Sequence, residues 1–251
     1  MSAGIKANND GSAAIQVGGT DYITISSAGA VAIPVSLTVG GVPAGGNYIL
    51  QNYTSPATWV KPLGLKAIKV TVVGGGGTGG SSTSGPANSG QSGGGGGGGG
   101  GAICYFNAPA IPGSPITITA GAGTNSFGPL ISATGGGNGG NGNVGVPGTA
   151  GAGGTGTVPS PAPSGAITLT GNPGFAGGPT QVNVIGANAA WGGTSQLFNT
   201  QRFQVYQPNT AGAPNSNIGT GGDGAATKVQ PTSTFTGGTG GPGIVIIEEF
   251  Y

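Results

Sequence analysis

The large aliphatic residues near the start of the chain alternate strictly with polar or small residues. They fall on odd-numbered positions only: Ile15, Val17, Ile23, Ile25, Val31, Ile33, Val35, Leu37 and Val39. Alternation with a period of two is typical of β-strands that bury one face. Gly18-Gly19 and Ser27-Ala28-Gly29 supply turns between the strands. Residues 1–14 are small and polar, and we expect them to form an extended arm.

A short β meander of this kind has an apolar face that nothing in the same segment covers. The simplest cover is the same segment of other copies of the chain, so we predict a homotrimer held together here. The alternative is that the rest of the same chain covers the sheet. We therefore interpret residues 1–46 as an N-terminal segment for attachment and oligomerisation.

Further strands are predicted beyond the glycine-rich hinge at residues 43–46. Tyr48–Tyr53 and Thr58–Val60 are expected to form a strand pair, and Ile68, Val70 and Val72 alternate with polar residues in the next strand. Shorter strands are predicted at 102–106 and 115–119, and a terminal strand at 243–251. No stretch has helical periodicity, so the predicted fold class is all-β with little or no α-helix.

A second period dominates the middle of the chain. Between residues 136 and 156 every third residue is glycine: Gly136, Gly139, Gly142, Gly145, Gly148, Gly151 and Gly154. Shorter triplet runs occur at 171–177 and 237–243. A polyproline-II helix has three residues per turn, so these glycines lie along one edge and let another backbone approach. The uninterrupted block 93–101 would span about 28 Å in this conformation.

Such helices have no internal hydrogen bonds, so their backbone groups must pair between neighbouring segments. We therefore predict that residues 47–251 form a glycine-rich domain of short strands and bundled polyglycine-II helices, ending in the strand 243–251. A three-chain collagen helix is the competing interpretation. It needs a longer Gly-X-Y run with more proline than the single Pro147 found here.

The composition narrows the possible functions. Of 251 residues, 61 are glycine and 19 are proline, while charged residues make up 4%. With six Lys+Arg against five Asp+Glu, the chain lacks the basic surface that nucleic acid or an anionic membrane requires. Neither a signal peptide nor an apolar run of membrane-spanning length is recognisable. The polar, uncharged surface is expected to be insensitive to ionic strength.

Residues for catalysis are scarce. The chain has no histidine, and its carboxylates are Asp10, Asp21, Asp223, Glu248 and Glu249. The last two are neighbours on a strand, so they point to opposite faces, and we interpret them as solvated charges at a strand end. Cys104 is expected to be a small buried core residue. We predict no enzyme activity, no catalytic or metal-binding residue and no cofactor.

One motif imitates a nucleotide-binding loop. Residues 70–73 followed by Gly74, Gly76 and Gly79 match a strand with G-x-G-x-x-G. That fingerprint needs a helix directly after the loop and an acidic residue about 20 positions later. Neither is present, so the match reflects the abundance of glycine.

Aromatic residues gather in one loop-rich stretch that contains Trp191, Phe198, Phe203 and Tyr206. Two interpretations are open: a local core, or a surface for contact with sugars or proteins. As a contact loop it would comprise Trp191, Phe198, Arg202 and Tyr206.

Several segments resemble the glycine-rich tail-fibre and adhesin proteins of tailed bacteriophages. The resemblance lies in TWVKPLGLKAIKVTVVGGGG at 58–77, SFGPLISATGGG at 126–137 and GGPGIVIIEEFY at 240–251, with AIQVGGTDYITISSAGAVAIPVSLTVGG at 14–41 similar to strands that link phage fibre domains. It implies a virion protein, usually trimeric, with a polyglycine-II bundle whose distal loops touch the host surface. No binding residue can be carried over, because none matches a fixed motif.

From the residues and the resemblance together we predict a virion structural protein made in the host cytoplasm. It would be a short fibre or adhesin for host attachment, binding other virion proteins through its N-terminal segment and a host surface protein or polysaccharide elsewhere. Alternatives are a capsid decoration or head-fibre protein and, from a different class, an ice-binding polyglycine-II protein. A third is a depolymerising enzyme with carboxylates meeting between copies.

Overall fold

The structure is a computed structural model that describes residues 48–83, 90–180, 190–198, 210–227 and 233–251, and six strands within residues 1–47. The chain divides into two compact units. The first comprises Met1–Tyr48 with Phe250–Tyr251, and the second comprises Ile49–Glu249. Among the described residues, no helix is long and apolar enough to cross a membrane.

The first unit is an antiparallel meander with the strand order β1-β2-β3-β4. Its strands are β1 (Ala3–Ala7), β2 (Ala13–Val17), β3 (Thr20–Ile25) and β4 (Val31–Ala32), followed by a separate pair of β5 (Thr38–Val39) and β6 (Val42–Pro43). The expected extended arm at residues 1–14 is wrong, because β1 pairs with β2 and places Ile5 opposite Ile15. Ala3, Ile5 and Ala7 continue the odd-numbered alternation. The predicted turns at 18–19 and 27–29 lie outside the described residues.

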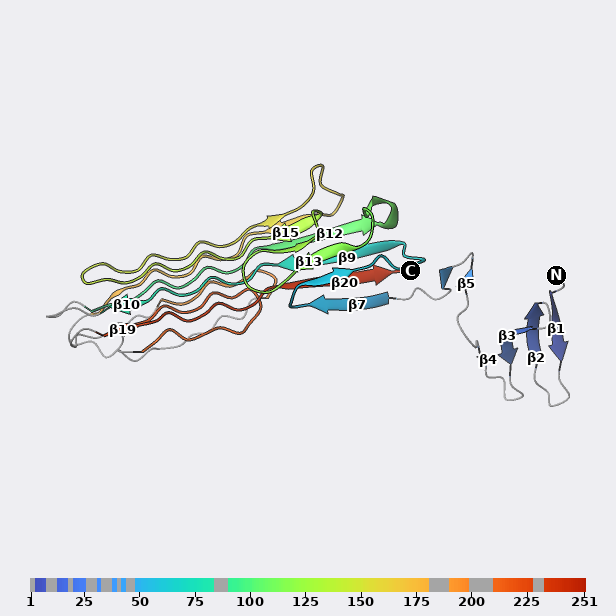
Figure 1. The fold of residues 1–251 in the computed structure, drawn as a ribbon, viewed down its shortest axis with the longest axis horizontal. Coiled ribbons are helices and arrows are strands. Elements are labelled where there is room, and N and C mark those ends of the chain that lie inside the picture. Colours follow the sequence, from blue (N-terminus) through green and yellow to red (C-terminus); the bar gives the residue numbers. More distant parts are fainter. Residues whose placement is uncertain are drawn as a thin grey trace. The chain divides into compact units, whose positions relative to one another are not determined.

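The second unit contains two five-stranded sheets (Figure 1). The first has the order β17 (Ile167–Leu169), β12 (Gly101–Asn107), β9 (Ala67–Val73), β20 (Ile244–Phe250) and β7 (Tyr48–Tyr53). The second has the order β16 (Gly156–Thr157), β15 (Ile131–Ala133), β14 (Asn125–Phe127), β13 (Ile116–Thr119) and β8 (Ala57–Trp59).

The two sheets pack together, with β9 and β12 lying against β14 and β15. Between them lies an apolar core that includes Trp59, Ile68, Val70, Ile118, Phe127, Ile131 and Ile247. The predicted pairing of Tyr48–Tyr53 with Thr58–Val60 is wrong. The chain crosses from one sheet to the other between them, so that β7 pairs with β20 and β8 pairs with β13, with Trp59 opposite Ile116.

The prediction of an all-β fold is confirmed for the described part of the chain. It consists of antiparallel sheets without an α-helix, and its helical content is one 3-10 turn, η1 (Ala108–Ala110). Two short strand pairs complete the unit: β10 (Ser82–Thr83) with β19 (Thr234–Phe235), and β11 (Gly90–Gln91) with β18 (Pro179–Thr180).

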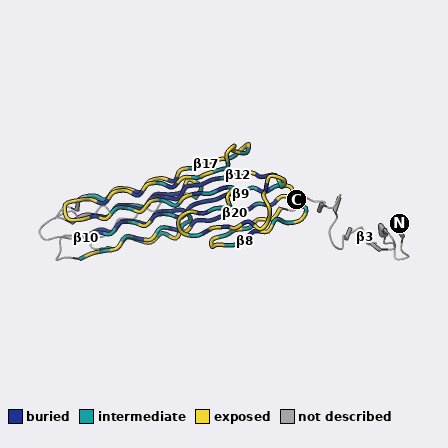
Figure 2. Tube along the Cα trace, turned by 45° about the horizontal axis from the view of Figure 1, so that its top comes forward, coloured by how far each residue is buried: buried dark blue, intermediate teal, exposed yellow. Residues whose placement is uncertain are grey.

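Extended glycine-rich segments continue from the sheets and run side by side (Figure 1). Residues 92–100, here called the central segment, are buried throughout (Figure 2). Their amides donate hydrogen bonds of 2.8–3.3 Å in strict rotation: those of Ser92, Gly95 and Gly98 to segment 172–178, those of Gly93, Gly96 and Gly99 to segment 219–225, and those of Gly94, Gly97 and Gly100 to segment 134–140.

The carbonyls of the central segment accept hydrogen bonds from three other segments. At 2.7–3.0 Å, the donors are Gly74, Gly77 and Gly80 of one segment, Gly148, Gly151 and Gly154 of another, and Gly193 of a third. The central segment therefore has six hydrogen-bonded neighbours, three that accept from it and three that donate to it. This arrangement satisfies backbone groups that have no partner within their own segment.

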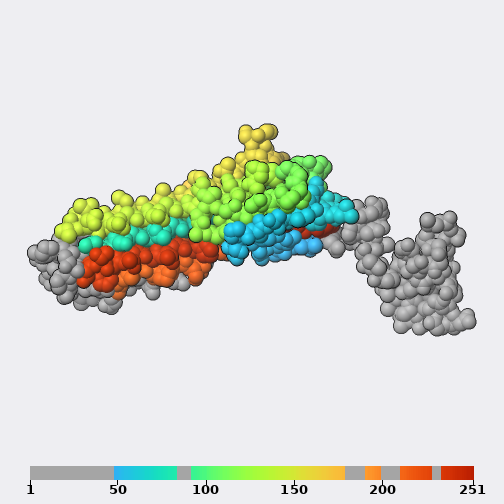
Figure 3. Space-filling model, viewed as in Figure 1, coloured from blue at the N-terminus to red at the C-terminus, as the bar shows by residue number. Residues whose placement is uncertain are grey.

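Glycine is required where the backbones of neighbouring segments approach most closely. A Cβ atom at Gly94 or Gly97 would lie 1.8 Å from the carbonyl oxygen of Thr149 or Ala152, and one at Gly99 would lie 1.9 Å from that of Gly74. Segment 219–227 is also buried throughout, whereas in the outer segments (Figure 3) about every third residue is buried. In segment 148–155, for example, the three glycines of the triplet are buried while Thr149, Ala150, Ala152 and Thr155 are exposed. The period of three marks an outer segment, and the unbroken glycine block marks the centre.

Polar side chains replace the missing neighbours at the edge of this array. The amide of Thr78 donates to Asn138 Oδ1 at 3.0 Å, and that of Ser81 donates to Asn141 Oδ1 at 2.9 Å. The amides of Gly139 and Gly142 donate back to the carbonyls of Thr78 and Ser81 at 2.8 Å. Each Asn-Gly pair thus forms hydrogen bonds with both the amide and the carbonyl of one residue, Thr78 or Ser81.

Candidate functional site

The end of the glycine-rich array farthest from the sheets is where most of its segments are linked. We call it the distal end, and among the described residues it comprises Ser82–Thr83, Gly90–Ser92, Gly142–Pro147, Gly178–Thr180, Thr210, Ala226–Thr227 and Thr234–Phe235 (Figure 1). At Gly145 an added Cβ would meet no atom within 4 Å, so space does not restrict the sequence of this end as it does within the array.

The connection at 143–146 is the described part of this end that projects apolar side chains. Asn143 and Val146 exchange backbone hydrogen bonds of 2.9 and 3.0 Å, and Gly145 between them has φ of 76°. This tight turn leaves Val144 50% and Val146 58% exposed. Two exposed valines on a backbone held by its own hydrogen bonds make a small, preorganised apolar surface.

The distal end carries no charged side chain among the described residues. In the second unit the described charged residues are Lys61, Lys66, Lys69, Asp223, Glu248 and Glu249, and all but Asp223 belong to the sheets and their loops. Asp223 is buried within the array, where its Oδ1 accepts from the amide of Gly192 at 2.9 Å. Contacts made by the described distal end are therefore apolar or neutral polar.

The aromatic residues predicted as a contact loop are not brought together where they are described. Trp191 lies level with Gly95, whose Cβ would meet the Trp191 carbonyl. Phe198 lines a separate hollow of about 270 Å³ with Ser216, Asn217 and Ile218, nearer the sheets. Phe203, Arg202 and Tyr206 lie outside the described residues.

Trp191 has an aromatic partner that sequence reasoning missed. Its ring packs edge-on against Phe175, with centroids 5.7 Å apart and an interplanar angle of 73°, and the Phe175 amide donates to the Trp191 carbonyl at 2.9 Å. Phe175 is 49% exposed and Trp191 is half-buried. Phe175 follows Gly174, a buried glycine of the triplet run 171–177. Its place between triplet glycines was the sequence signal that its side chain faces outward.

The carboxylates at the end of β20 do not form a catalytic pair. Glu248 pairs with Lys69 at 2.8 Å, whereas Glu249 is fully buried on the other face of the strand. The prediction that both are solvated is therefore wrong for Glu249. Its Oε1 accepts from Trp59 Nε1 at 2.6 Å and from Gln51 Nε2 at 2.7 Å, so neutral donors on β8 and β7 compensate its burial.

Burial raises the pKa of two further groups, Tyr53 and Cys104. Tyr53 donates to Gln51 Oε1, and burial, followed by the nearby Glu249 carboxylate, raises the pKa of its phenol. Burial also raises the pKa of the Cys104 thiol, and its position in the core confirms the sequence interpretation. A thiol held in its protonated form among apolar side chains is a poor nucleophile. The described residues contain no group of three His, Cys, Asp or Glu side chains that could hold a metal ion.

Comparisons with known proteins name no family for this chain. No protein-family model matches the chain, and no curated protein sequence matches it significantly.

Proposed function

We propose that this chain is a virion structural protein of a tailed bacteriophage, a short fibre or adhesin that holds its distal end towards the host surface. The observation that carries the proposal is the central segment with its six hydrogen-bonded neighbours. A backbone array of this kind needs almost no apolar core, so it can form a stiff, charge-poor projection. Because close approach restricts the residues within the array, positions that are free to vary lie at its two ends.

The proposal includes a finer account of the fold. The extended glycine-rich segments would be polyglycine-II helices, which have three residues per turn and no internal hydrogen bonds; the rotation of the central segment's amides among three neighbours supports this. The N-terminal meander would form a homotrimer, because its apolar alternation needs a cover. Assembly would then place three distal ends on one particle fibre. Simultaneous contacts raise the apparent affinity without any new interaction.

Host contact would rest on the distal end, through Val144 and Val146. Exposed apolar side chains on an uncharged surface suit a protein surface of similar character. Binding there would depend little on salt, because neither charged steering nor ion pairs take part.

Adsorption competition tests this function. Purified protein, added in excess to host cells, is expected to slow adsorption of the parent phage, and a Val144→Asp/Val146→Asp double variant is expected to lose most of that effect. Thr149→Asp, which adds one charge to an exposed side of the array, serves as the control. Equal competition by the wild type and the double variant would remove the role assigned to the distal end.

A capsid decoration or head-fibre protein is the alternative within the virion, and the position of the chain on the particle separates the two. An ice-binding protein is the more distant alternative. It is favoured by the exposed row Thr149, Ala152 and Thr155, which repeats at about 9 Å for three residues of such a helix. The neighbouring Phe175 and Pro173 interrupt the flat face that ice binding requires. Thermal hysteresis of the purified protein distinguishes this alternative.

A further inference from the structure

A hollow of about 460 Å³ lies at the end of the sheets opposite the glycine-rich array. It is lined by Lys61, Pro62, Leu63, Gly64, Leu65, Ala108 and Pro109. The strand β9 starts just beyond it and runs towards Gly74, where the array begins, which fixes its place in the unit.

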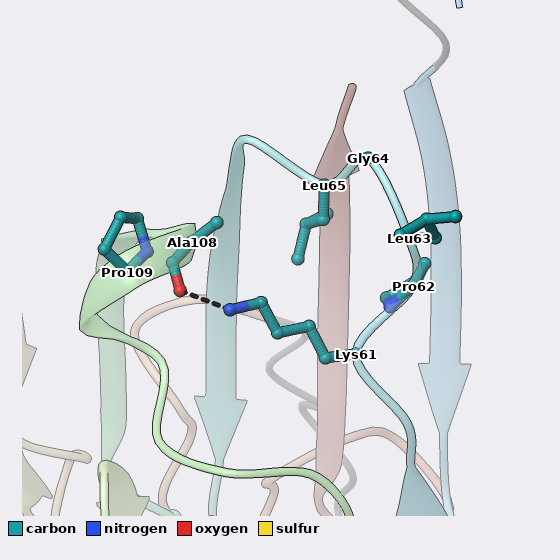
Figure 4. Close-up of a pocket in the computed structure, with 7 residues that line it drawn as sticks. All are labelled: Lys61, Pro62, Leu63, Gly64, Leu65, Ala108 and Pro109. Carbon is teal, nitrogen blue, oxygen red and sulfur yellow. Dashed lines mark hydrogen bonds between the residues drawn. The ribbon is translucent and has the colours of Figure 1, made fainter. Parts of the chain in front are cut away.

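The turn beside the hollow presents one side chain almost completely to solvent. Leu63 and Gly64 occupy the two corner positions, and Gly64 has φ of 80°, which suits the glycine position of a type II turn. Leu63 is 99% exposed, and the nearby Val60 is also exposed. In Figure 4 the Lys61 side chain extends across the hollow towards Ala108, whereas Leu63 points to the other side of the turn. The surface therefore offers both an apolar recess and an apolar knob.

Lys61 gives the recess a positive charge. Its Nζ donates to the Ala108 carbonyl at 2.6 Å, and its own amide donates to Ser114 Oγ at 3.0 Å, which holds the side chain over the recess. An ammonium group has three donors, so further donors can face a ligand. Among the described residues neither Lys61 nor the exposed Lys66 has a carboxylate partner, since the recorded ion pair joins Lys69 to Glu248.

We propose that this recess and Leu63 seat the unit on a second, different protein of the particle, which inserts an aliphatic side chain and places a carboxylate against Lys61. The inference rests on the proposed virion function and specifies the attachment side of the molecule. A side chain buried in a pocket contributes to the affinity of an interface, and a complementary charge beside it contributes mainly to orientation and specificity.

Charge argues against a second copy of this chain as the occupant. In the described part of the second unit, Glu248 is engaged by Lys69, while Asp223 and Glu249 are buried. A copy therefore has no exposed carboxylate of this unit to offer. Two copies meeting face to face at this end would bring Lys61 and Lys66 of each against those of the other, and like charges oppose that contact.

Phage particles grown with variant chains test the proposal. The copies of this protein per particle are measured by quantitative mass spectrometry against the main coat protein. Leu63→Asp is expected to lower the copy number at least tenfold and Lys61→Gln at least threefold, while Leu63→Met stays near the wild type. Ile167→Asp, which places the same charge at another exposed aliphatic residue on β17, is expected to have no effect.

The control measurements separate the possible failures. Melting temperatures of the purified variants must match the wild type, which is expected because Leu63 packs against nothing that folding requires. If the wild type itself is absent from particles, the virion function fails and this inference with it. If the wild type is present on particles and both Leu63→Asp and Lys61→Gln reach the wild-type copy number, the inference alone is overturned. It is also overturned if Asp10→Asn/Asp21→Asn reproduces the loss, because the chain's own N-terminal unit would then supply the carboxylate.

Discussion

A single methyl group is too large for the glycine positions of the central segment, Gly93–Gly100. At Gly97 the added carbon would lie 1.8 Å from the Ala152 oxygen, and the contact is with backbone that carries its own hydrogen bonds. Neither partner can move without breaking bonds to a third segment. Only glycine fits in this part of the chain, because neighbouring backbones enclose it and leave no room for a side chain.

Gly97→Ala is therefore expected to destabilise the protein by more than about 3 kcal/mol, at or beyond the upper range for overpacking. Thermal unfolding followed by circular dichroism measures the loss. Gly113→Ala is the matched control, because its Cβ would meet no atom within 4 Å. Equal melting temperatures for the two variants would show that the segment is not enclosed as described.

Side chains at the edge of the array act as acceptors for backbone amides. Asn138→Ala and Asn141→Ala each remove the partner of one amide, and each is expected to cost about 0.5–1.5 kcal/mol. Asparagine-to-aspartate changes retain the acceptor oxygen and should restore most of the stability at neutral pH. Asn143→Ala, whose side chain makes no described hydrogen bond, is the control in the same denaturation series. Loss of stability that is equal for alanine and aspartate would exclude the acceptor role.

Tyr53 gives a pH-dependent contribution to stability. Its pKa is raised above the ordinary value of 10.0, first by burial and then by Glu249. The folded state thus retains the phenol proton longer than the unfolded chain. This contribution is complete below the unfolded pKa and is lost as the pH rises through the folded pKa. Unfolding free energies measured from about pH 8 to 11.5 should fall less steeply for Tyr53→Phe than for the wild type, and parallel curves would contradict the assignment.

At the scale of elements, the hydrogen-bond rotation of the central segment fixes its register. Successive amides point to three different neighbours, so one inserted residue redirects every amide beyond it, while three inserted residues restore each direction. A single glycine inserted between Gly93 and Gly94 is expected to lower the melting temperature far more than three glycines at the same place. An effect that grows simply with insertion length would contradict the rotation.

The sequence predicts many of the strands and extended segments, but not which of them lie side by side. The triplets at 136–154 predict extended segments that pair with one another. The position of 92–100 at the centre was missed, although an unbroken glycine block already signifies close approach on every side. The strand predicted at 48–53 coincides with β7, and the one predicted at 58–60 is shifted one residue beyond β8, but a strand pattern does not name partners, so their pairing was wrong. Glu249 was misplaced because its donors, on β7 and β8, come from about 190 residues earlier in the chain.

At the scale of the whole molecule, stability depends little on charge. The described ion pair, Lys69 with Glu248, is partly exposed, and such pairs contribute at most about 1 kcal/mol. Raising sodium chloride from about 0.05 to 1 M is therefore expected to shift the melting temperature by no more than about 4 °C. A larger fall would point to an electrostatic contribution that the described residues do not contain.

Location on the particle tests the central claim most directly. Electron microscopy with gold-labelled antibodies raised against the peptide of residues 138–150, which contains the distal turn at 143–146, would place this end of the chain. The account predicts label at the free ends of tail fibres, with purified wild-type protein abolishing it by competition. Label on the capsid surface would support the decoration alternative, and particles without label would contradict the virion function.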